Sequence, residues 1–341
     1  MTATPYPIIT GLGAQRLHDE PWRVVVAGAG GWMGLAALEA LHGLLGDDFH
    51  RRVAAFGSNA RRLCLRGGLQ VEQRPLSTMR DLPRARTLVL YFAFLTQEKA
   101  GRMPREQYIA ANALISDQVF AALEPIGAHG VFVASSGAVE MVDQPGADPN
   151  KALYGELKLK DEARFAAWAE GVDKRCVIAR IFGLSGPYIN KIDSYALACF
   201  IADGLAGRPI EIKSSWPVFR SYVAVDELLS VVFGLLTDGE GGTTRFDTGA
   251  ERGYEMAEIA ALVAGALGHV HGIQRPALLD DAPDRYVGDG AFYAQLRRLN
   301  RVQRIGFAAQ VRETARFMAE TRDGPAVSVY DWGQTEGMTA T

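Results

Sequence analysis

The chain has 341 residues, of which 48% are hydrophobic and 22% charged, a composition that is typical of a folded globular protein and excludes a disordered or fibrous one. Lys and Arg number 36 against 39 for Asp and Glu, so the formal net charge is −3. The sequence has no long run of like charge, and no nucleic-acid partner is therefore expected. No apolar stretch reaches the roughly 20 residues that a membrane-spanning helix needs, so no membrane partner is expected.

The first 21 residues are expected to form a tail. They include Pro5 and Pro7, end in charged residues and lack the apolar core of a signal peptide. The three cysteines, Cys64, Cys176 and Cys199, are widely spaced and form no CxxC pair, which indicates neither a disulfide framework nor a zinc site. Both observations predict a protein of the reducing cytoplasm.

The first strong element is a β-branched strand over residues 22–27, which breaks into a glycine-rich turn over 28–34. A stretch of helical composition over 35–41 follows the turn. Further strands are predicted over 53–56, 69–72, 87–92, 130–134 and 175–181, and helices over about 105–123 and 152–170. The alternation predicts an α/β fold, a Rossmann-type doubly wound parallel sheet, with residues 22–180 as a dinucleotide-binding domain.

After residue 181 the alternation loosens, and a smaller C-terminal α/β lobe over residues 181–330 is expected to bind the substrate. It contains a predicted helix over about 194–205 and a short strand over 209–212. A helix near 226–236 is expected to return to the main sheet, with Asp226 as its N-cap. Residues 332–341 are expected to be a second tail.

The glycine turn lies where the pyrophosphate of a dinucleotide binds. A helix N-terminus presents unpaired N–H groups and the positive end of the helix dipole, and glycine lets a phosphate approach the backbone. Gly28, Gly31 and Gly34 would provide the tight turn, the phosphate approach and the helix-to-strand contact. A strand-to-helix turn without a ligand is the alternative, but the position directly after the first strand favours dinucleotide binding.

The residues beyond the second strand favour NADP(H) over NAD(H). A carboxylate about 20 residues beyond the glycine turn would bind the ribose hydroxyls of NAD, yet no Asp or Glu occurs between Asp48 and Glu72. Ser58, Arg61 and Arg62 follow the strand instead, a small hydroxyl and two cations placed to meet a phosphate. Cations that merely solvate the start of a helix would be the structural alternative.

A Tyr-x-x-x-Lys pair and a serine indicate proton-transfer chemistry. Tyr154 and Lys158 would share one helix face, where the lysine would lower the pKa of a phenol whose ordinary value is about 10. Such a pair by itself is common on helix surfaces. Ser136 strengthens the interpretation because it ends an apolar strand, where ligands of parallel sheets bind, and its hydroxyl can hold a carbonyl oxygen.

Together these motifs resemble those of the extended short-chain dehydrogenase/reductases, the NAD(P)-dependent epimerase/dehydratase family that acts on nucleotide sugars. The glycine spacing G-x-x-G-x-x-G and the order Ser136, Tyr154, Lys158 are similar to the family's, and the resemblance covers roughly residues 22–322. It implies catalytic roles for these three residues, and contact of Ser136 with the substrate. The full set of expected cofactor-binding residues is Gly28, Gly30, Gly31, Trp32, Met33, Gly34, Ser58, Arg61 and Lys158.

The resemblance extends into the second half of the chain. Arg220 and Arg285 lie in segments similar to those that hold the nucleotide diphosphate, and a planar guanidinium suits phosphate oxygens, although surface ion pairs are the alternative. Gly183 replaces an asparagine that family members often use to contact the sugar. Asn112 is similar to the family's asparagine in the helix before the catalytic strand, where a structural role is the alternative.

Among the family's reactions, the residues favour a reduction. Sugar-nucleotide dehydratases carry an Asp-Glu pair after the active hydroxyl residue, whereas Gly137 and Ala138 follow Ser136 here. The expected function is an NADPH-dependent 4-ketoreductase of a nucleotide-linked 4-keto-6-deoxyhexose; the alternatives are an NAD-dependent 4-epimerase and a non-catalytic NAD(P)-binding sensor. The resemblance also implies a homodimer, with helices 105–123 and 152–170 forming a four-helix interface. His269 and His271 lack a third ligand at useful spacing, so no metal is expected.

Overall fold

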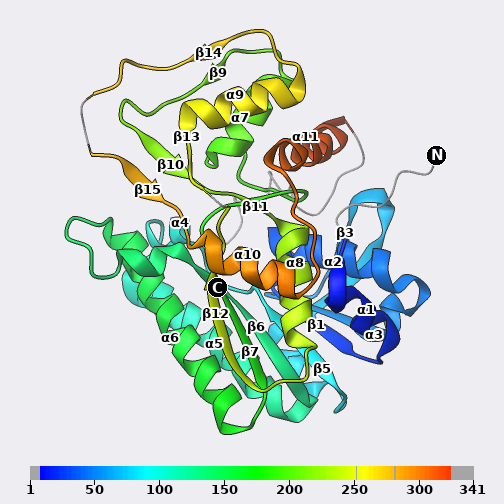
Figure 1. Ribbon diagram of the computed structural model, residues 1–341. Coiled ribbons are helices and arrows are strands. Elements are labelled where there is room, and N and C mark those ends of the chain that lie inside the picture. Colours follow the sequence, from blue (N-terminus) through cyan, green and yellow to red (C-terminus); the bar gives the residue numbers. More distant parts are fainter. Residues whose placement is uncertain (1–7, 251, 280–281, 324–341) are drawn as a thin grey trace.

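A computed structural model describes residues 8–250, 252–279 and 282–323 of the protein. Its centre is an eight-stranded sheet in the order β12-β7-β6-β5-β1-β2-β4-β3 (Figure 1). All neighbouring pairs are parallel except β3 and β4. The strands are β1 (Arg23–Ala27), β2 (Val53–Gly57), β3 (Arg61–Cys64), β4 (Gln70–Pro75), β5 (Thr87–Tyr91), β6 (Ala128–Ser136), β7 (Arg175–Ile181) and β12 (Gly242–Asp247). The predicted doubly wound parallel sheet is confirmed.

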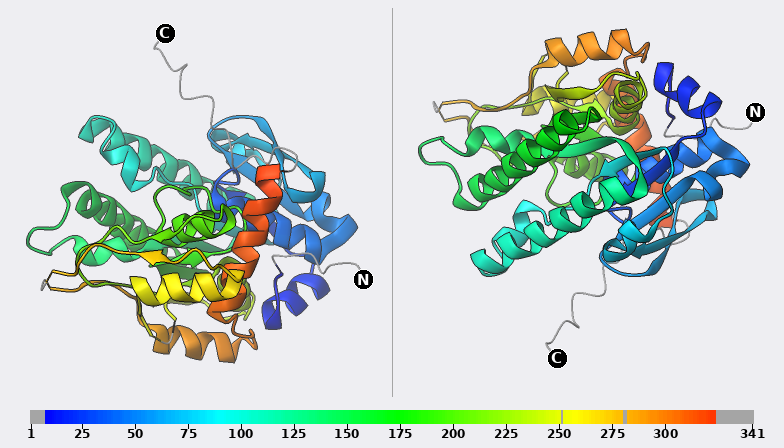
Figure 2. Two further views of the ribbon diagram at one scale, coloured as in Figure 1. Left: turned by 90° about the horizontal axis from the view of Figure 1, so that it is seen from above. Right: turned by 90° about the horizontal axis from the view of Figure 1, so that it is seen from below.

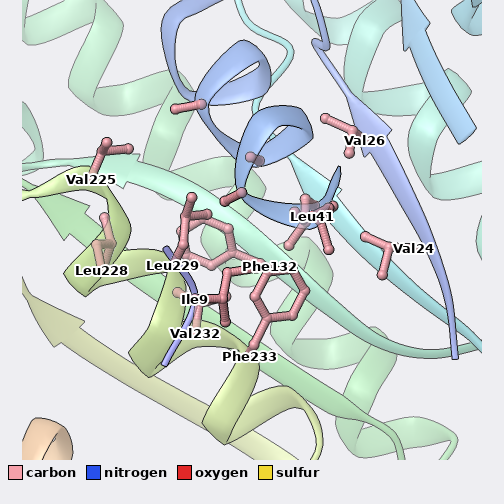
Figure 3. Packing of buried hydrophobic residues seen from close by; sticks show 14 of the residues in the cluster. Ile9, Val24, Val26, Leu41, Phe132, Val225, Leu228, Leu229, Val232 and Phe233 are labelled. Carbon is pink, nitrogen blue, oxygen red and sulfur yellow. The ribbon is translucent and has the colours of Figure 1, made fainter. Parts of the chain in front are cut away.

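Helices cover both faces of this sheet. On one face, α2 (Trp32–Leu45) and α8 (Val225–Leu236) pack against it, and on the other α5 (Arg105–Ile126) and α6 (Pro149–Gly171) run side by side (Figure 2). Figure 3 shows the first of these layers, in which Val24 and Val26 of β1 and Phe132 of β6 meet Leu229 and Phe233 of α8. These side chains are fully buried, and each contributes roughly 1.5–3 kcal/mol through the hydrophobic effect.

Side chains alternate along β1, so the same strand supplies both layers. Val24 and Val26 face α2 and α8, whereas Val25 and Ala27 pack with the residues of α5 and α6. A strand buried on both sides needs a continuous apolar run, and this is why residues 22–27 contain almost no polar side chain.

The N-terminal segment is part of the fold, contrary to the expected tail over residues 1–21. Helix α1 (Gly11–Asp19) packs against α8, and Ile9 and Leu17 are buried in the main core. Its short length and its two glycines give a weak sequence pattern, so tertiary packing decides its conformation. Residues 1–7 and 332–341, which belong to the two expected tails, lie outside the described residues.

The smaller lobe lies above the carboxyl ends of the main strands (Figure 1). Its helices are α7 (Ala196–Leu205), α9 (Met256–Leu267) and α11 (Phe307–Asp323), whereas α10 (Gly290–Leu299) packs against β12 of the main sheet. A three-stranded sheet contains β13 (Tyr254–Glu255), β10 (Val218–Arg220) and β15 (Asp284–Tyr286), and two strand pairs join β11 (Val223–Ala224) to β8 (Leu184–Ser185) and β14 (Ile273–Gln274) to β9 (Ile210–Glu211). The assignment of the whole of 181–330 to substrate binding stays a prediction.

Short helical turns complete the structure: α3 (Phe49–Arg52), α4 (Gln97–Ala100) and 3₁₀ turns at Gly46–Asp48, Arg66–Gly68, Leu76–Asp81 and Gly137–Met141. Within the described ranges, the helices are all too short or too polar to cross a lipid bilayer.

Helix α8 returns to the main sheet as expected, but its N-cap is Ala224 and not Asp226. Asp226 lies inside the first turn together with Glu227, where a carboxylate still complements the positive end of the helix dipole. The prediction therefore missed the start of the helix by two residues.

Candidate active site

The site lies where the direction of strand order reverses. From β1 the chain builds the sheet toward β2, β4 and β3, and it then crosses to β5, β6, β7 and β12 on the other side. The loops after β1 and β5 meet at this point, because the backbone N–H groups of Phe92 and Ala93 both donate to the Ala27 carbonyl, at 2.8 and 3.0 Å. Such a reversal opens a crevice at the carboxyl ends of the strands, where α/β proteins bind ligands.

The glycine turn fits a phosphate-bearing cofactor in its detailed geometry. Gly28 has a φ of +90°, a conformation that side-chain-bearing residues rarely adopt. A Cβ at Gly34 would collide with the Gly28 carbonyl and with Ala29, so α2 packs directly on the turn. Gly31 is the N-cap of α2 and leaves the first N–H groups of the helix facing the crevice without a side chain in the way.

Trp32 and Met33 line the same crevice at the start of α2. The Trp32 indole donates a 2.7 Å hydrogen bond to the Pro187 carbonyl and therefore ties the glycine turn to the chain segment that leads into the smaller lobe.

Arg61 reaches the glycine turn, but Arg62 does not. The two arginines belong to strand β3, and so the alternative of a helix start does not apply. Arg61 pairs with Gln73 and Arg62 with Glu72 of β4, so the two arginines face opposite sides. A Cβ at Gly30 would collide with the Arg61 guanidinium. Ser58 is exposed just beyond β2.

Gln73 shares this corner, and sequence reasoning missed it. Its side chain is 3% exposed, its amide nitrogen donates to the Asn59 carbonyl at 2.9 Å, and its Oε1 has no hydrogen-bond partner among the described residues. It fills the space beside Gly57 at the end of β2. An uncharged amide therefore lies beside the carboxyl end of β2.

A cavity of about 770 Å³ runs from the glycine turn to the smaller lobe. This volume lies within the usual range for small-molecule sites. Residues from the main sheet, α6, α7, β10 and β15 line it, among them Gly28, Trp32, Phe94, Ser136, Lys151, Tyr154, Lys158, Arg220, Asp284 and Tyr286.

Ser136 and Tyr154 meet in this cavity as the sequence predicts. Ser136 is the last residue of β6, and its Oγ accepts a 3.2 Å hydrogen bond from the Ala138 N–H, which fixes the side chain. It also hydrogen-bonds the Tyr154 hydroxyl and lies 3.3 Å from the Tyr286 hydroxyl. Three hydroxyl groups thus converge at the carboxyl end of β6.

Lys158 lies one turn beyond Tyr154 on α6 and is buried. Its Nζ donates to the Ala134 carbonyl at 2.8 Å, and lies 3.7 Å from the centroid of the Phe94 ring and 5.7 Å from that of Tyr154. Burial lowers the pKa of Lys158 to about 8, and the carboxylates of Asp161 and Glu162 on the next turn oppose this effect.

The pKa of Tyr154 is raised, whereas the sequence led us to expect that Lys158 would lower it. Burial is the main cause, and the neighbouring phenol of Tyr286 adds to it. Lys158 is turned toward the Ala134 carbonyl, and the Phe94 ring packs edge-on against Tyr154 at 5.5 Å between ring centroids. Burial and the Tyr286 phenol therefore both favour the protonated form of the tyrosine hydroxyl.

In the smaller lobe, Arg220 lines the cavity but Arg285 does not. Side chains alternate along β15, so Asp284 and Tyr286 face the cavity and Arg285 points the other way, with its guanidinium 4.0 Å from the centroid of the Phe219 ring. Arg285 is thus not among the residues that line this cavity, and its contact with a diphosphate stays a prediction. Arg220 forms a 2.7 Å ion pair with Asp284.

Asn112 has a structural role, because it contacts a loop that lines the cavity. It is buried, its Oδ1 accepts from the Leu95 N–H at 2.8 Å, and its amide donates to the Tyr108 carbonyl at 3.1 Å. It therefore holds the loop that carries Phe94. Gly183 also has a local reason, because a Cβ there would collide with the Ser221 carbonyl.

His269 and His271 lie with their ring centroids 5.2 Å apart at the end of α9. Among the residues that the structure describes, no group of three His, Cys, Asp or Glu side chains is placed to hold a metal ion.

Comparison with known proteins agrees with this geometry. Residues 24–247 match the model of the NAD dependent epimerase/dehydratase family. The chain belongs to this family. It is therefore an enzyme of the NAD(P)-dependent epimerase/dehydratase type, and the resemblance predicted from its motifs is confirmed. No curated protein matches it.

Solved structures share the fold at low sequence identity. UDP-N-acetylglucosamine 4-epimerase from Methanobrevibacter ruminantium, in complex with UDP-N-acetylmuramic acid, is 16% identical with a TM-score of 0.69, and the match covers 88% of this chain and 98% of that one. UDP-glucose 4-epimerase from Thermus thermophilus with NAD is 19% identical (TM-score 0.63, 87% and 99% covered). The dTDP-glucose 4,6-dehydratase DesIV from Streptomyces venezuelae with NAD is 17% identical (TM-score 0.65, 88% and 98% covered).

Proposed function

We propose that the enzyme is an NADPH-dependent 4-ketoreductase of a nucleotide-linked 4-keto-6-deoxyhexose. The observation that carries the proposal is the meeting of the Ser136 and Tyr154 hydroxyls at the carboxyl end of β6, in a cavity that extends to the glycine turn. Arg220, on the opposite wall, is the remaining candidate for the substrate diphosphate.

The residues divide the reduction between them. When bound, the nicotinamide cofactor supplies the hydride to the keto carbon. Tyr154 gives its proton to the ketone oxygen, which becomes the product hydroxyl, and Ser136 donates a hydrogen bond to the same oxygen. Lys158 would turn from the Ala134 carbonyl to the cofactor ribose and to the tyrosinate that proton transfer leaves. Hydride and proton together convert one ketone to one alcohol.

The raised pKa of Tyr154 supports reduction over epimerisation. An epimerase must first oxidise its substrate and so needs a tyrosinate as the base, whereas a ketoreductase needs the protonated phenol. Burial keeps the phenol protonated here. The NAD-dependent 4-epimerase is therefore the second candidate.

A dehydratase is disfavoured by packing as well as by residue type. A Cβ at Gly137, directly after Ser136, would collide with the ring of Phe182, so no carboxylate side chain fits at that position. Elimination of water needs a further acid and base besides Tyr154, and Gly137 and Ala138, the two positions after Ser136, supply neither.

The cofactor preference rests on the corner between the glycine turn and β3. Arg61 lies against Gly30 and would bind the 2′-phosphate of NADP, while Gln73 takes the place of the carboxylate that would hold the ribose of NAD. Gly28, Gly31 and Gly34 would hold the pyrophosphate. NADPH also suits a net reduction, because the oxidised cofactor leaves after each turnover.

The test is to incubate the enzyme with NADPH and a panel of nucleotide-linked 4-keto sugars, and to follow both NADPH absorbance and the products. One NADPH consumed for each alcohol formed is expected for the ketoreductase. Interconversion of nucleotide sugars without net NADPH consumption would identify the epimerase instead. Binding of cofactor without turnover of any sugar would identify a non-catalytic sensor.

A further inference from the structure

A lysine without an ion-pair partner lies beside the reacting hydroxyls. Lys151 is one turn before Tyr154 on α6 and lines the cavity. Among the described residues, no carboxylate lies within ion-pair distance of its ammonium group. The ammonium group lies over the face of the Tyr286 ring, whose centroid is 4.6 Å from Nζ.

Tyr286 lies between Lys151 and the hydroxyl group of Ser136. The hydroxyl of Tyr286 is 3.3 Å from Ser136 Oγ, and its ring carries Lys151 on its face. Lys151 therefore lies at the same end of the cavity as the Ser136 and Tyr154 hydroxyls.

The carboxylates around Lys151 have other partners. Asp284 is paired with Arg220 at 2.7 Å, and the Asp148 carboxylate caps α6 by accepting from the Lys151 backbone N–H at 2.8 Å. The Arg220 guanidinium carbon lies 5.9 Å from the centroid of the same Tyr286 ring. Lys151 and Arg220 thus both lie near the Tyr286 ring, and within the described residues only Arg220 forms an ion pair with Asp284.

Lys151 is half-buried, and a charge that is partly removed from water without a paired anion is unfavourable unless a ligand compensates it. Burial and the Arg220 charge lower the pKa of Lys151, and the charges of Asp284 and Asp148 oppose this effect without cancelling it. An anionic substituent of the ligand would supply the compensating charge, and a carboxylate bonded to an ammonium group forms a charge-assisted hydrogen bond.

We propose that Lys151, on the face of Tyr286, binds a carboxylate carried by the sugar of the substrate, so that the enzyme prefers an acidic nucleotide sugar. This inference rests on the proposed function, because it assumes that a nucleotide sugar binds in the cavity. A carboxylate on an ether- or amide-linked substituent is compatible with the 6-deoxy sugar. A carboxylate at carbon 6 would instead take the place of the methyl group, and the sugar would be a uronic acid.

The experiment compares matched probes by isothermal titration calorimetry. UDP-glucuronic acid is paired with UDP-glucose, and UDP-N-acetylmuramic acid with UDP-N-acetylglucosamine, so that any preference for the base cancels within a pair; UDP alone is the fifth probe. In the wild-type enzyme, at least one acidic probe is expected to bind roughly tenfold or more tightly than its neutral partner.

Three variants locate the effect. Lys151→Met is expected to remove the preference for the acidic probe while the affinities for the neutral sugar and for UDP change by less than about twofold, and Lys151→Arg is expected to retain it. Lys160→Met is the control, since Lys160 lies on the exposed side of the same helix and pairs with Glu156. Thermal melting checks that each variant is folded.

Two results would overturn the inference alone. The first is equal wild-type affinity for the acidic and neutral members of both pairs. The second is a Lys151→Met variant that loses affinity for UDP and for all four sugars alike, which would assign Lys151 to the diphosphate. A wild-type enzyme that binds none of the five probes would contradict the proposed function together with the inference.

Discussion

Lys158 is the residue at which stability and function oppose each other most directly. It is 4% exposed, and the protein around it provides one backbone carbonyl, one aromatic ring and two carboxylates on the next helical turn. Because the pKa of Lys158 is lowered to about 8, the folded protein releases its proton more readily than the unfolded chain does. The lysine therefore lowers the free energy of unfolding at neutral pH. We propose that it is present because it binds the cofactor ribose.

Replacing Lys158 by Met is expected to abolish turnover and yet stabilise the fold at pH 7 by roughly 1–3 kcal/mol, after allowance for the lost bond to the Ala134 carbonyl. Between pH about 8 and 10.5, the unfolded chain binds more protons than the native state does. The free energy of unfolding of wild type therefore increases as the pH rises through this window. The difference in free energy of unfolding between wild type and Lys158→Met should decrease by about 1 kcal/mol from pH 7 to pH 9. Urea unfolding at both pH values measures it. A Met variant that is less stable by the same amount at both would contradict the account.

Arg61 and Arg62 form a matched pair for the cofactor preference, because neighbouring positions on β3 face opposite sides. Arg61→Ala should weaken NADPH binding by roughly tenfold or more and NADH binding by less than about twofold, since only NADPH carries the 2′-phosphate. Arg62→Ala should leave both affinities unchanged. Titration of the fluorescence of the reduced nicotinamide provides the dissociation constants. Equal wild-type affinity for the two cofactors would refute the NADP(H) preference and favour the epimerase.

Site residues that have a characteristic spacing in the sequence could be predicted, whereas site residues that come together only in the folded structure could not. Tyr154 and Lys158 are one helical turn apart, and Ser136 ends a strand whose apolar run is visible in the sequence. Tyr286 and Gln73 reach the site from β15 and β4, and nothing in their local sequence marks them. Lys151 could have been noticed, because a position three residues before Tyr154 on a helix lies on the same face.

Among the elements, α1 shows how one buried arginine holds a helix that its own sequence barely specifies. The Arg52 guanidinium donates to the carbonyls of Leu17, Glu20 and Trp22 at 2.5, 2.7 and 2.9 Å. These carbonyls belong to the end of α1 and the connection to β1. Sequence periodicity cannot predict this helix, because it contributes little apolar surface itself and depends on α8 and Arg52 for its stability.

Arg52→Met is expected to lower the free energy of unfolding by about 2–4 kcal/mol, because three backbone carbonyls lose their donor. Its neighbour Arg51 provides the control: it is exposed and pairs only with Asp48, so Arg51→Met should cost less than about 1 kcal/mol. Chemical denaturation measures both. Similar losses for the two variants would show that α1 does not depend on Arg52.

The main-sheet elements were predictable for the opposite reason. Strands buried on both faces require continuous apolar runs, and β7 extends over 175–181 as predicted. Strand β3 was missed because it is short, has two exposed arginines and pairs antiparallel at the edge of the sheet.

In the whole molecule, α5 and α6 present their outer faces away from the sheet, and Leu114 of α5 is 58% exposed there. We propose that this pair of helices forms the interface of a homodimer. Light scattering should show a dimer at micromolar concentration and a monomer for Leu114→Glu, whereas Leu299→Glu, at an equally exposed position on α10, should leave the dimer intact. A wild-type monomer would refute the interface.

In the proposed reaction a ketone binds between the main sheet and the smaller lobe, where NADPH would supply the hydride and the hydroxyls at the carboxyl end of β6 would hold and protonate the ketone oxygen. The most direct test is the rate of NADPH-dependent reduction of a nucleotide-linked 4-keto-6-deoxyhexose by wild type and by Tyr154→Phe. The phenylalanine variant should lose at least about 100-fold in kcat while its affinity for NADPH and its thermal stability stay close to wild type. A variant that retains near wild-type turnover would show that Tyr154 is not the proton donor.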